Sequence, residues 1–487
     1  MSESNRKKRI AIVGAGLSGL TAAFRLLQQT SYEQQFEITL YEKSSRIGGV
    51  FGTVEQDGYR LETGADSFIT NKPQALQLCE DLRLTERLIS TQSEFRRSLI
   101  LHQGKPVPTP KGFNLMVPQQ LWPLLSSPLL SVRGKLRVLG EILVRSNPQQ
   151  DESLSGFVTR RFGRELMENI VQPMIGGIYT ADPEKLSLRA TLPRFLEMEA
   201  EYGSLLKSIW KNRKQLLRSQ KEKASGVRYG LFASLKEGMS ELLQALWQKV
   251  EPQVDCQLGT QVEQITFDSA SKQYTIQSTN AQNEKQQHTF DALILATPGQ
   301  TSAKLARDFA PQWSQAMTGI EYASSAIVVT GHRLADIEHN MDAFGLVIPN
   351  KENRQILAVS FTSRKFAQRA PEGSIQLRTF VGGAMQPENL KLNDDQLTEL
   401  VLKELAEIFG VSGTPETVKV ARWNQAMPQY HVGHLEKVER IKQLQTEHPN
   451  FESIGNALDG VGLPDVIATA TAAVKRLLET WDTKKDH

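Results

Sequence analysis

Cross-linking residues are scarce in this sequence. It contains two cysteines in 487 residues, Cys79 and Cys256, and neither stands in a CxxC pair. Two cysteines placed in this way support no disulfide framework, and they suit a reducing compartment. We interpret both as packing residues.

Long hydrophobic runs are absent as well. No stretch reaches the roughly 18 consecutive apolar residues that a membrane-spanning helix requires. Residues 1–9 are polar and basic without the apolar core of a signal peptide, and no transit peptide is recognisable. We therefore expect a cytoplasmic protein with, at most, peripheral contact with a membrane.

Neither sign of charge dominates the composition. The 57 Lys and Arg residues against 54 Asp and Glu give a net charge of +3, which is too small to indicate a nucleic-acid partner. The eight histidines are scattered without metal-ligand spacing, and no Ser/His/Asp set is visible. These absences argue against a metal centre and against nucleophilic catalysis.

What the sequence does have, at its start, is a strand–turn–helix–strand pattern. The apolar run 9–13 passes directly into a glycine turn, Gly14–Gly19. Apolar residues at three- and four-residue spacing then indicate a helix to Leu27, and a second strand, 36–41, ends at Glu42. This order is typical of the dinucleotide-binding βαβ unit.

Each glycine of the turn has a physical role in binding a dinucleotide. Gly14 permits the tight turn, Gly16 lets the backbone approach a pyrophosphate, and Gly19 lets the helix pack closely on the strand. The free N–H groups at the start of the helix hold phosphates. Glu42 stands where a carboxylate that accepts from a ribose hydroxyl is expected.

The residues after Glu42 indicate which dinucleotide is bound. Lys43–Gly49 contains an Arg-x-Gly-Gly turn, and a further glycine follows within Glu62–Phe68. This continuation resembles the extended fingerprint of flavoproteins with two dinucleotide-binding domains. The resemblance implies FAD bound without a covalent link, with Arg46 near the phosphates. An ordinary surface loop with turn glycines is the alternative interpretation.

The middle of the chain changes character. Residues 109–224 are expected to be all-helical, with a glycine-rich loop at 172–180 and a further helical stretch at 192–224. The crowded apolar residues of 113–130 are interrupted by prolines, so a single long helix is excluded there. These residues fit one of two interpretations. They form either the core of a helical subdomain or a surface that contacts a membrane or binds a hydrophobic substrate.

The cofactor domain is expected to be discontinuous, because its sequence signals lie far apart along the chain. Predicted strands between 258 and 382 also indicate a second sheet. We expect FAD-binding segments at 1–90, 225–300 and 416–487, substrate-domain segments at 91–110 and 301–415, and a helical, possible membrane-contacting insertion at 111–224.

Four later stretches indicate a narrower family: 202–205, 231–239, 369–384 and 460–465. In order and spacing they resemble protoporphyrinogen oxidases, the oxygen-dependent flavoenzymes of haem synthesis, over nearly the whole chain. The last stretch is most similar to the bacterial branch whose members act as coproporphyrinogen III oxidases. The implied fold class is α/β (α+β), a Rossmann-like, amine-oxidase-like flavoprotein with a mixed-sheet substrate domain and an all-helical insertion.

This resemblance also implies an activity. Members of the family take six electrons from a porphyrinogen in steps of two, with FAD as hydride acceptor, dioxygen as oxidant and hydrogen peroxide as by-product. The chain is expected to be a monomer or a homodimer.

The choice of porphyrinogen is expected to depend on cations. Coproporphyrinogen III has four carboxylates and protoporphyrinogen IX has two, and a buried carboxylate without a partner is costly. The stretch beside the FAD motifs offers Lys72, Arg96, Arg97, Lys105 and Lys111. We therefore expect coproporphyrinogen III to be the better substrate, with protoporphyrinogen IX also accepted.

Site residues are assigned by the same resemblance. Those implied for the substrate are Arg97, Phe380, Val347, Gly176, Gly177 and Lys72. Arg97 would pair with a propionate, with Arg96 as the alternative match. Phe380 would stack on a pyrrole ring, and Val347 stands where plant-type members carry a larger leucine.

A larger set is implied for FAD. It comprises Gly14, Ala15, Gly16, Leu17, Ser18, Gly19, Glu42, Lys43, Arg46, Gly48, Gly49, Gly64, Ala65, Asp66, Ser67, Val262, Trp423, Gly455, Asn456, Val461, Gly462 and Leu463.

Two other functions stay open at this point. An amine oxidase or desaturase shares the first fingerprint, but amine oxidases attach FAD through a cysteine near the C-terminus, and no cysteine follows Cys256. A non-catalytic relative, like the Rab-escort proteins, would keep the βαβ unit and bind a protein partner. The glycines Gly455, Gly460 and Gly462 would then serve no purpose.

Overall fold

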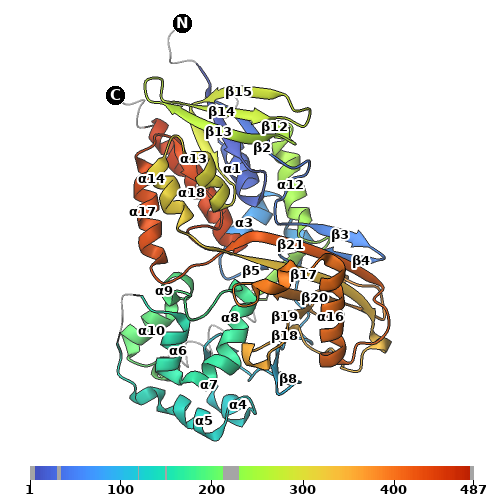
Figure 1. Cartoon of the computed structure of the whole chain (residues 1–487). Helices are drawn as coiled ribbons and strands as arrows, with labels where there is room; N and C mark the ends of the chain where they lie inside the picture. The colour runs from blue at the N-terminus through green and yellow to red at the C-terminus, as the bar shows by residue number, and fades with distance from the viewer. Residues whose placement is uncertain (1–5, 30–34, 119, 148–150, 212–229, 483–487) are drawn as a thin grey trace.

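The computed structural model describes residues 6–29, 35–118, 120–147, 151–211 and 230–482 (Figure 1). One half is built on a five-stranded parallel sheet in the order β12-β2-β1-β16-β22. Its strands are β1 (Lys8–Val13), β2 (Phe36–Glu42), β12 (Asp255–Leu258), β16 (Ala292–Leu295) and β22 (Phe451–Ser453). The sheet joins the beginning, the middle and the end of the chain, as the sequence predicts.

Both faces of this sheet are buried, which explains why its central strands are apolar without alternation. Ile10 and Ile12 point into one core, whereas Ala11 and Val13 point into another. The first core is covered by α1 (Leu17–Leu27), α3 (Gln74–Asp81), α12 (Ser240–Val250) and α18 (Leu463–Asp482). The second is covered by α13 (Gly299–Ala306), α14 (Pro311–Thr318), α17 (His434–Thr446) and the sheet of β13 (Gln261–Asp268), β14 (Gln273–Thr279) and β15 (Lys285–Phe290).

The other half is built on a mixed seven-stranded sheet in the order β21-β17-β20-β19-β18-β7-β8. Its strands are β7 (Leu99–His102), β8 (Lys105–Pro108), β17 (Tyr322–Arg333), β18 (Gly345–Val347), β19 (Ala358–Phe361), β20 (Ser374–Gly382) and β21 (Thr417–Pro428). One face packs on α16 (Asp394–Phe409), whose first turn is closed by a capping box between Asn393 and Gln396. The opposite face looks toward the cofactor half and the helical layer (Figure 1).

The helical layer lies at the lower left in Figure 1, beside β18 and β8 of the seven-stranded sheet. Its elements are α4 (Leu121–Ser126), α5 (Val132–Leu139), η3 (Gly140–Leu143), α6 (Leu154–Phe162), α7 (Arg164–Leu166), η4 (Met167–Val171), α8 (Gln172–Tyr179), α9 (Leu188–Thr191) and α10 (Arg194–Tyr202). A short hairpin, β9 (Phe113–Asn114) and β10 (Val117–Pro118), precedes them. The buried Arg161 pairs with Glu141 and Glu199, so a charged cluster ties α6, η3 and α10 together.

The remaining elements connect these parts. They are β3 (Thr53–Gln56), β4 (Tyr59–Glu62), β5 (Phe68–Ile69), η2 (Thr85–Arg87), β6 (Leu88–Ser90), β11 (Phe232–Leu235), η5 (Leu334–Asp336), η6 (Asn350–Glu352), α15 (Thr362–Lys365) and η7 (Pro387–Lys391). Cys79 is fully buried, and Cys256 packs against the same core. The interpretation of both cysteines as packing residues is therefore confirmed.

Two expectations about local structure were wrong. Residues 172–180 form helix α8 instead of a loop, because the helix continues from η4 and buries Pro173 and Ile175. That packing outweighs the low helix propensity of Gly176 and Gly177. The helical stretch expected over 192–224 is broken at Gly203, which adopts a left-handed conformation. Its last part, residues 212–224, lies outside the described residues.

The expected domain limits differ from the structure at two places. β21 pairs with β17 in the seven-stranded sheet, although residues from 416 onward were expected in the cofactor domain. α13 and α14 pack on the five-stranded sheet, although residues from 301 were expected in the substrate domain. The division into domains otherwise remains a proposal.

Candidate cofactor and substrate site

The glycine turn between β1 and α1 forms a cradle that is closed on two sides and open on the third. A Cβ atom added to Gly14 would lie 2.8 Å from the Ala296 carbonyl oxygen, and one added to Gly19 would lie 1.9 Å from that of Gly14. A Cβ added to Gly16, the N-cap of α1, would meet nothing within 4 Å. The open side therefore lies at the helix N-terminus, which suits an anion.

Glu42 lies beside this cradle. Its carboxylate accepts from the Ala15 N–H at 2.9 Å and from the Ser44 N–H at 2.9 Å. The Glu42 carbonyl accepts from the Thr260 N–H, so the connection from β12 to β13 is held next to it. Val262 follows two residues later in β13. The residues expected at the adenosine end are thus brought together.

Arg46 binds the loop that carries it. Its guanidinium donates to the carbonyls of Ile47, Gly49 and Phe51 at 3.0–3.3 Å. These bonds shape the loop on which Gly48 and Gly49 adopt positive φ angles. Gly49 lies next to Gly16, because a Cβ added to it would be 3.7 Å from the Gly16 Cα. Arg46 therefore positions the glycine pair beside the cradle.

Asp66 forms ion pairs within the protein. Its carboxylate is buried and pairs with Lys365 at 3.0 Å and with Arg378 at 3.1 Å. Burial favours its protonation, but the two cations outweigh this effect and hold the pKa of Asp66 far below its ordinary value. Ser67 donates to the same carboxylate at 2.7 Å. The Asp66 carboxylate is therefore bound by the protein itself.

The same segment is held from the seven-stranded sheet. Arg378 of β20 donates to the Gly64 carbonyl, and the Trp423 indole N–H of β21 donates to the Thr63 carbonyl at 2.8 Å. A Cβ added to Gly64 would lie 2.0 Å from the Val50 carbonyl oxygen. The predicted FAD residues Gly64 and Trp423 thus meet where the two halves of the molecule join.

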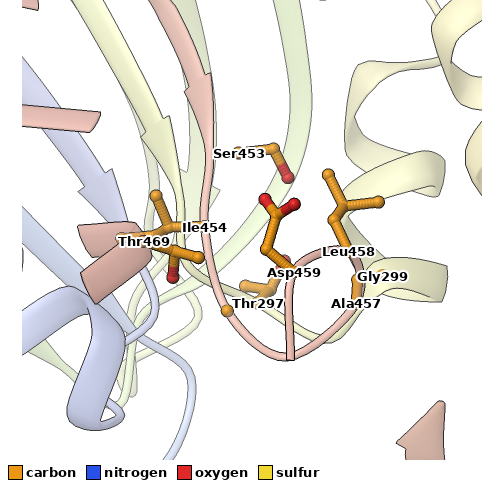
Figure 2. A pocket seen from close by; sticks show the side chains of 9 residues that line it. Thr297, Gly299, Ser453, Ile454, Ala457, Leu458, Asp459 and Thr469 are labelled. Carbon is orange, nitrogen blue, oxygen red and sulfur yellow. The ribbon is translucent and has the colours of Figure 1, made fainter. Parts of the chain in front are cut away.

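The C-terminal glycine turn, residues 455–463, approaches the cradle from β22. Gly455 has φ +128°, and a Cβ added to it would lie 3.8 Å from the Ser18 hydroxyl oxygen of α1. Beside it lies a small pocket (Figure 2), lined by Thr297, Gly299, Ser453, Ile454, Gly455, Ala457, Leu458, Asp459 and Thr469. This pocket stands at the carboxyl ends of β16 and β22, where open parallel sheets bind ligands.

The predicted substrate residues Phe380 and Val347 share one face of the seven-stranded sheet. Phe380 is paired with Ala358, and Ala358 is paired with Val347, so the three stand in one row across β20, β19 and β18. Residues paired side by side in a sheet point to the same face. Both Phe380 and Val347 are half-buried, which leaves part of each side chain accessible.

Other predicted residues gather around this row. A Cβ added to Gly177 of α8 would lie 3.7 Å from the Val347 Cγ1 atom. Val461 of the C-terminal turn packs in the same apolar cluster as Val347. Trp423 and Phe380 pack together against a second cluster that contains Ile327. The row therefore lies beside α8 of the helical layer.

The predicted cationic residues are more exposed than the Phe380–Val347 row. Arg97 is half-exposed and pairs with Asp342 at 2.7 Å, and it precedes the apolar face at Ile100 by three residues. Arg96 lies against Gly230 instead. Lys72 pairs with Asp465 in the first turn of α18, directly beside Gly462. Lys72 thus lies nearest to the C-terminal turn.

Sequence reasoning missed several residues of this region. Lys365 and Arg378 hold Asp66, and Tyr430 and His434 bind the C-terminal turn. For Arg378 a signal existed, because a buried arginine interrupts the apolar strand Ile375–Val381. The other three have no comparable signal in the sequence.

Comparison with known proteins decides the family. A family model described as flavin containing amine oxidoreductase matches residues 17–478. The chain belongs to this family. It is an FAD-dependent oxidoreductase, and the open cradle at Gly16 fits the pyrophosphate of that cofactor.

Relatives match over the full length. The chain is 32% identical to coproporphyrinogen III oxidase of Bacillus subtilis over 481 residues, which cover 98% of this chain and 99% of the relative. It is 31% identical to coproporphyrinogen III oxidase of Staphylococcus aureus, with 97% and 99% covered. Protoporphyrinogen oxidase 2 of Arabidopsis thaliana is 28% identical, with 96% and 93% covered.

Solved structures agree on the fold. A crystal structure of an Exiguobacterium protein assigned as a protoporphyrinogen oxidase has a TM-score of 0.83 at 27% identity, covering 98% of this chain and 100% of that one. Reduced UDP-galactopyranose mutase has a TM-score of 0.69 at 17% identity, covering 97% and 96%, and shows the fold alone. The predicted family and fold class are confirmed, apart from the short β9–β10 hairpin within the helical insertion.

Proposed function

We propose that the chain oxidises a porphyrinogen to the porphyrin, with dioxygen as final oxidant, and that coproporphyrinogen III is its better substrate. The observation that carries this proposal is the full-length similarity to the bacterial proteins named coproporphyrinogen III oxidase. FAD, when bound, supplies the hydride acceptor for such an oxidation. An amine oxidase or desaturase is less well supported, because the solved amine oxidases are only 13–15% identical.

In this proposal the sheet face forms one wall of the substrate site. The Phe380 ring and the Val347 side chain offer a flat, apolar surface, and Gly177 allows α8 to approach Val347 closely. A macrocycle placed on this wall would lie near the turn that carries Val461, because Val461 and Val347 pack against the same apolar cluster. The walls orient the substrate and exclude water, which favours transfer to the flavin.

The carboxylates would be bound at the rim. Arg97 is half-exposed, and its present partner Asp342 is a carboxylate that a propionate can replace. Lys72 is similarly exposed and paired with Asp465. Charged groups at a wet rim suit a substrate with four carboxylates, because none of them has to be fully desolvated.

The substrate proposal is tested by comparing kcat/KM for the two porphyrinogens. Both are prepared anaerobically and assayed in the same detergent. We expect a higher value for coproporphyrinogen III. A value at least tenfold higher for protoporphyrinogen IX, about 1.4 kcal/mol, would reverse the assignment. The absence of turnover with either would refute the function.

The cofactor site has its own test. Gly16→Val places a side chain in the open cradle without a clash of its Cβ atom, and its φ of −76° is ordinary for valine. The variant is expected to fold and to lose FAD. A Gly16→Val protein that keeps a full complement of FAD would refute the placement of the pyrophosphate.

We also propose weak peripheral contact with a membrane, through a surface of the 111–224 insertion that overlaps only partly with the predicted stretch 113–130. Within 113–130, the side chains of Met116, Leu124 and Leu129 are buried, so this stretch mainly forms core. The exposed apolar residues lie on α4, α5 and η3, and we call this surface the α4–η3 face. It comprises Leu121, Trp122, Val132, Leu136, Leu139, Ile142 and Leu143. Among the described helices, none is both long and apolar enough to cross a bilayer.

A further inference from the structure

Two stacked rings lie directly behind the C-terminal glycine turn. Tyr430 and His434 are 3% and 2% exposed, and their ring centroids are 3.9 Å apart with an angle of 15° between the planes. Tyr430 precedes α17, and His434 is the first residue of that helix. Neither residue belongs to the wall or the rim described above.

The two rings bind the turn at every second residue. The Tyr430 hydroxyl donates to the Asn456 carbonyl at 2.6 Å and accepts from the Gly460 N–H at 2.9 Å. The His434 Nε2 atom lies 3.0 Å from the Leu458 carbonyl oxygen. Burial lowers the pKa of His434, so its ring is neutral. Because a carbonyl oxygen only accepts, the proton of that neutral ring belongs on Nε2.

The turn needs such support from outside. Gly455 and Gly460 have φ angles of +128° and +131°, which residues with a side chain rarely adopt. Glycine permits this conformation but does not enforce it, because it has many others available. Three hydrogen bonds from buried rings select one conformation among them.

The opposite side of the ring pair is fixed to the helical layer. The Tyr430 carbonyl accepts from the Ser187 N–H at 2.8 Å, and Leu186 forms a β-bridge with His431. The Gly433 N–H donates to the Asp151 carboxylate at 3.0 Å. The rings therefore connect the helical layer, which covers the substrate wall, to the turn that is proposed to face the flavin.

We propose that Tyr430 and His434 are positioning residues for the flavin, which hold the turn 455–463 in the one conformation that FAD recognises. This inference rests on the proposed placement of that turn against FAD. It predicts that the two rings determine FAD affinity and the midpoint potential of the bound flavin, beyond any effect on folding.

The test uses variants that keep the stacked ring and remove only its polar atoms. Tyr430→Phe removes both hydroxyl bonds, and His434→Phe removes the bond to Leu458. We expect Tyr430→Phe to weaken FAD binding on the order of tenfold, as the loss of buried hydrogen bonds predicts. Its flavin midpoint potential and visible spectrum should shift as well. His434→Gln, which keeps a side-chain N–H, should recover part of what His434→Phe loses.

Tyr274→Phe is the matched control. Tyr274 is also fully buried, and its hydroxyl donates to the Pro449 carbonyl at 2.8 Å, in the core beneath β14. This variant should lose thermal stability and bind FAD like the unmodified chain. Normal FAD affinity and potential in both Tyr430→Phe and His434→Phe would overturn the inference, as would equal losses in Tyr274→Phe. If Tyr430→Phe does not fold, the comparison of His434→Phe with His434→Gln decides whether the ring contacts determine FAD binding.

The Gly16→Val variant separates this inference from the cofactor site itself. If Gly16→Val loses FAD while the ring variants bind it normally, the cradle is correct and the positioning role is wrong. If Gly16→Val binds FAD normally, the cofactor placement on which the inference rests is wrong.

Discussion

Asp66 illustrates how single residues connect the two halves of the molecule. Its carboxylate lies between Lys365 and Arg378, which come from the seven-stranded sheet region, while Asp66 itself follows β4. Arg378 also donates to the Gly64 carbonyl. The ion pairs therefore fix the segment 63–67 against β20, the strand that carries Phe380.

Removing this carboxylate leaves two buried cations without their partner. Asp66→Asn is therefore expected to lower the free energy of unfolding by about 3–5 kcal/mol. Urea denaturation at neutral pH measures it. Asp57→Asn is the control, because Asp57 is exposed in a turn with φ +54°, which asparagine tolerates. A loss in Asp66→Asn no larger than in Asp57→Asn would contradict the role of the cluster.

Arg97 is expected to contribute modestly to substrate binding. Because its side chain is 49% exposed and paired with Asp342, water already screens its charge. Arg97→Ala should raise KM for the porphyrinogen on the order of tenfold, the low end for a charge-assisted bond, and leave FAD content unchanged. Steady-state kinetics test it beside Arg96→Ala. A larger effect in Arg96→Ala would move the assignment by one residue.

At this scale the sequence predicts backbone roles better than side-chain partners. Gly14, Gly16 and Gly19 could be assigned because a turn motif encodes its own local geometry. The partners of Asp66 could not, since they depend on which distant strand packs beside it. The bonds from Arg46 to the carbonyls of its own loop could not be predicted either, and its position near the phosphates stays a prediction.

Elements were predictable where a local pattern decides them. The βαβ unit follows from a continuous apolar run and helical spacing, and it lies where the sequence predicts it. α8 was missed because its glycines argue against a helix, and only its packing on the helical core reverses that. β21 was placed in the wrong half because nothing local in Thr417–Pro428 reveals that it pairs with β17.

β17 contains a histidine that should make stability depend on pH. His332 is 1% exposed, its Nε2 lies 2.9 Å from the Thr330 hydroxyl oxygen, and burial lowers its pKa to about 4. Above pH 6.5 the His332 ring is neutral in the folded and in the unfolded chain, so it does not change the free energy of unfolding with pH. Between pH 6.5 and about 4 only the unfolded chain binds the proton, so stability falls as the pH falls, by about 3 kcal/mol in total.

His332→Gln removes this titration and keeps a polar group for Thr330. The fall in the free energy of unfolding between pH 7 and pH 4.5 should therefore be smaller in this variant than in the unmodified chain. His102→Gln, on the β7–β8 hairpin, serves as the control. Equal pH dependence in all three proteins would show that His332 does not titrate as its burial predicts.

At the scale of the whole molecule, the chain crosses between its two halves several times. The five-stranded sheet draws strands from near residues 8, 36, 255, 292 and 451, and the seven-stranded sheet uses the segments between them. The candidate site lies where these halves and the helical layer meet. No single segment contains it, so it depends on the relative placement of all three parts, which explains why buried connectors such as Arg378 and Tyr430 matter.

The α4–η3 face lies at the far end of the helical layer from the five-stranded sheet (Figure 1). Trp122, Val132, Leu136 and Leu143 on this face are 63–86% exposed. Arg133 is exposed on α5 and Arg145 is exposed just after η3, whereas Glu141 of η3 is fully buried. An apolar surface flanked by cations suits shallow contact with an anionic lipid surface.

The double variant Leu136→Glu, Leu143→Glu is expected to bind phosphatidylglycerol vesicles more weakly, on the order of a hundredfold. Two apolar side chains no longer enter the lipid surface, and two negative charges face the anionic lipid instead. Sedimentation with vesicles at low salt measures it. Leu231→Glu with Met385→Glu, which are exposed at 58% and 41% outside this face, provides the control and should bind normally. High salt should weaken binding of the unmodified chain, because its electrostatic part is screened. Equal binding of the Leu136 and Leu143 variant, or protein that only detergent releases, would contradict a shallow contact through this face.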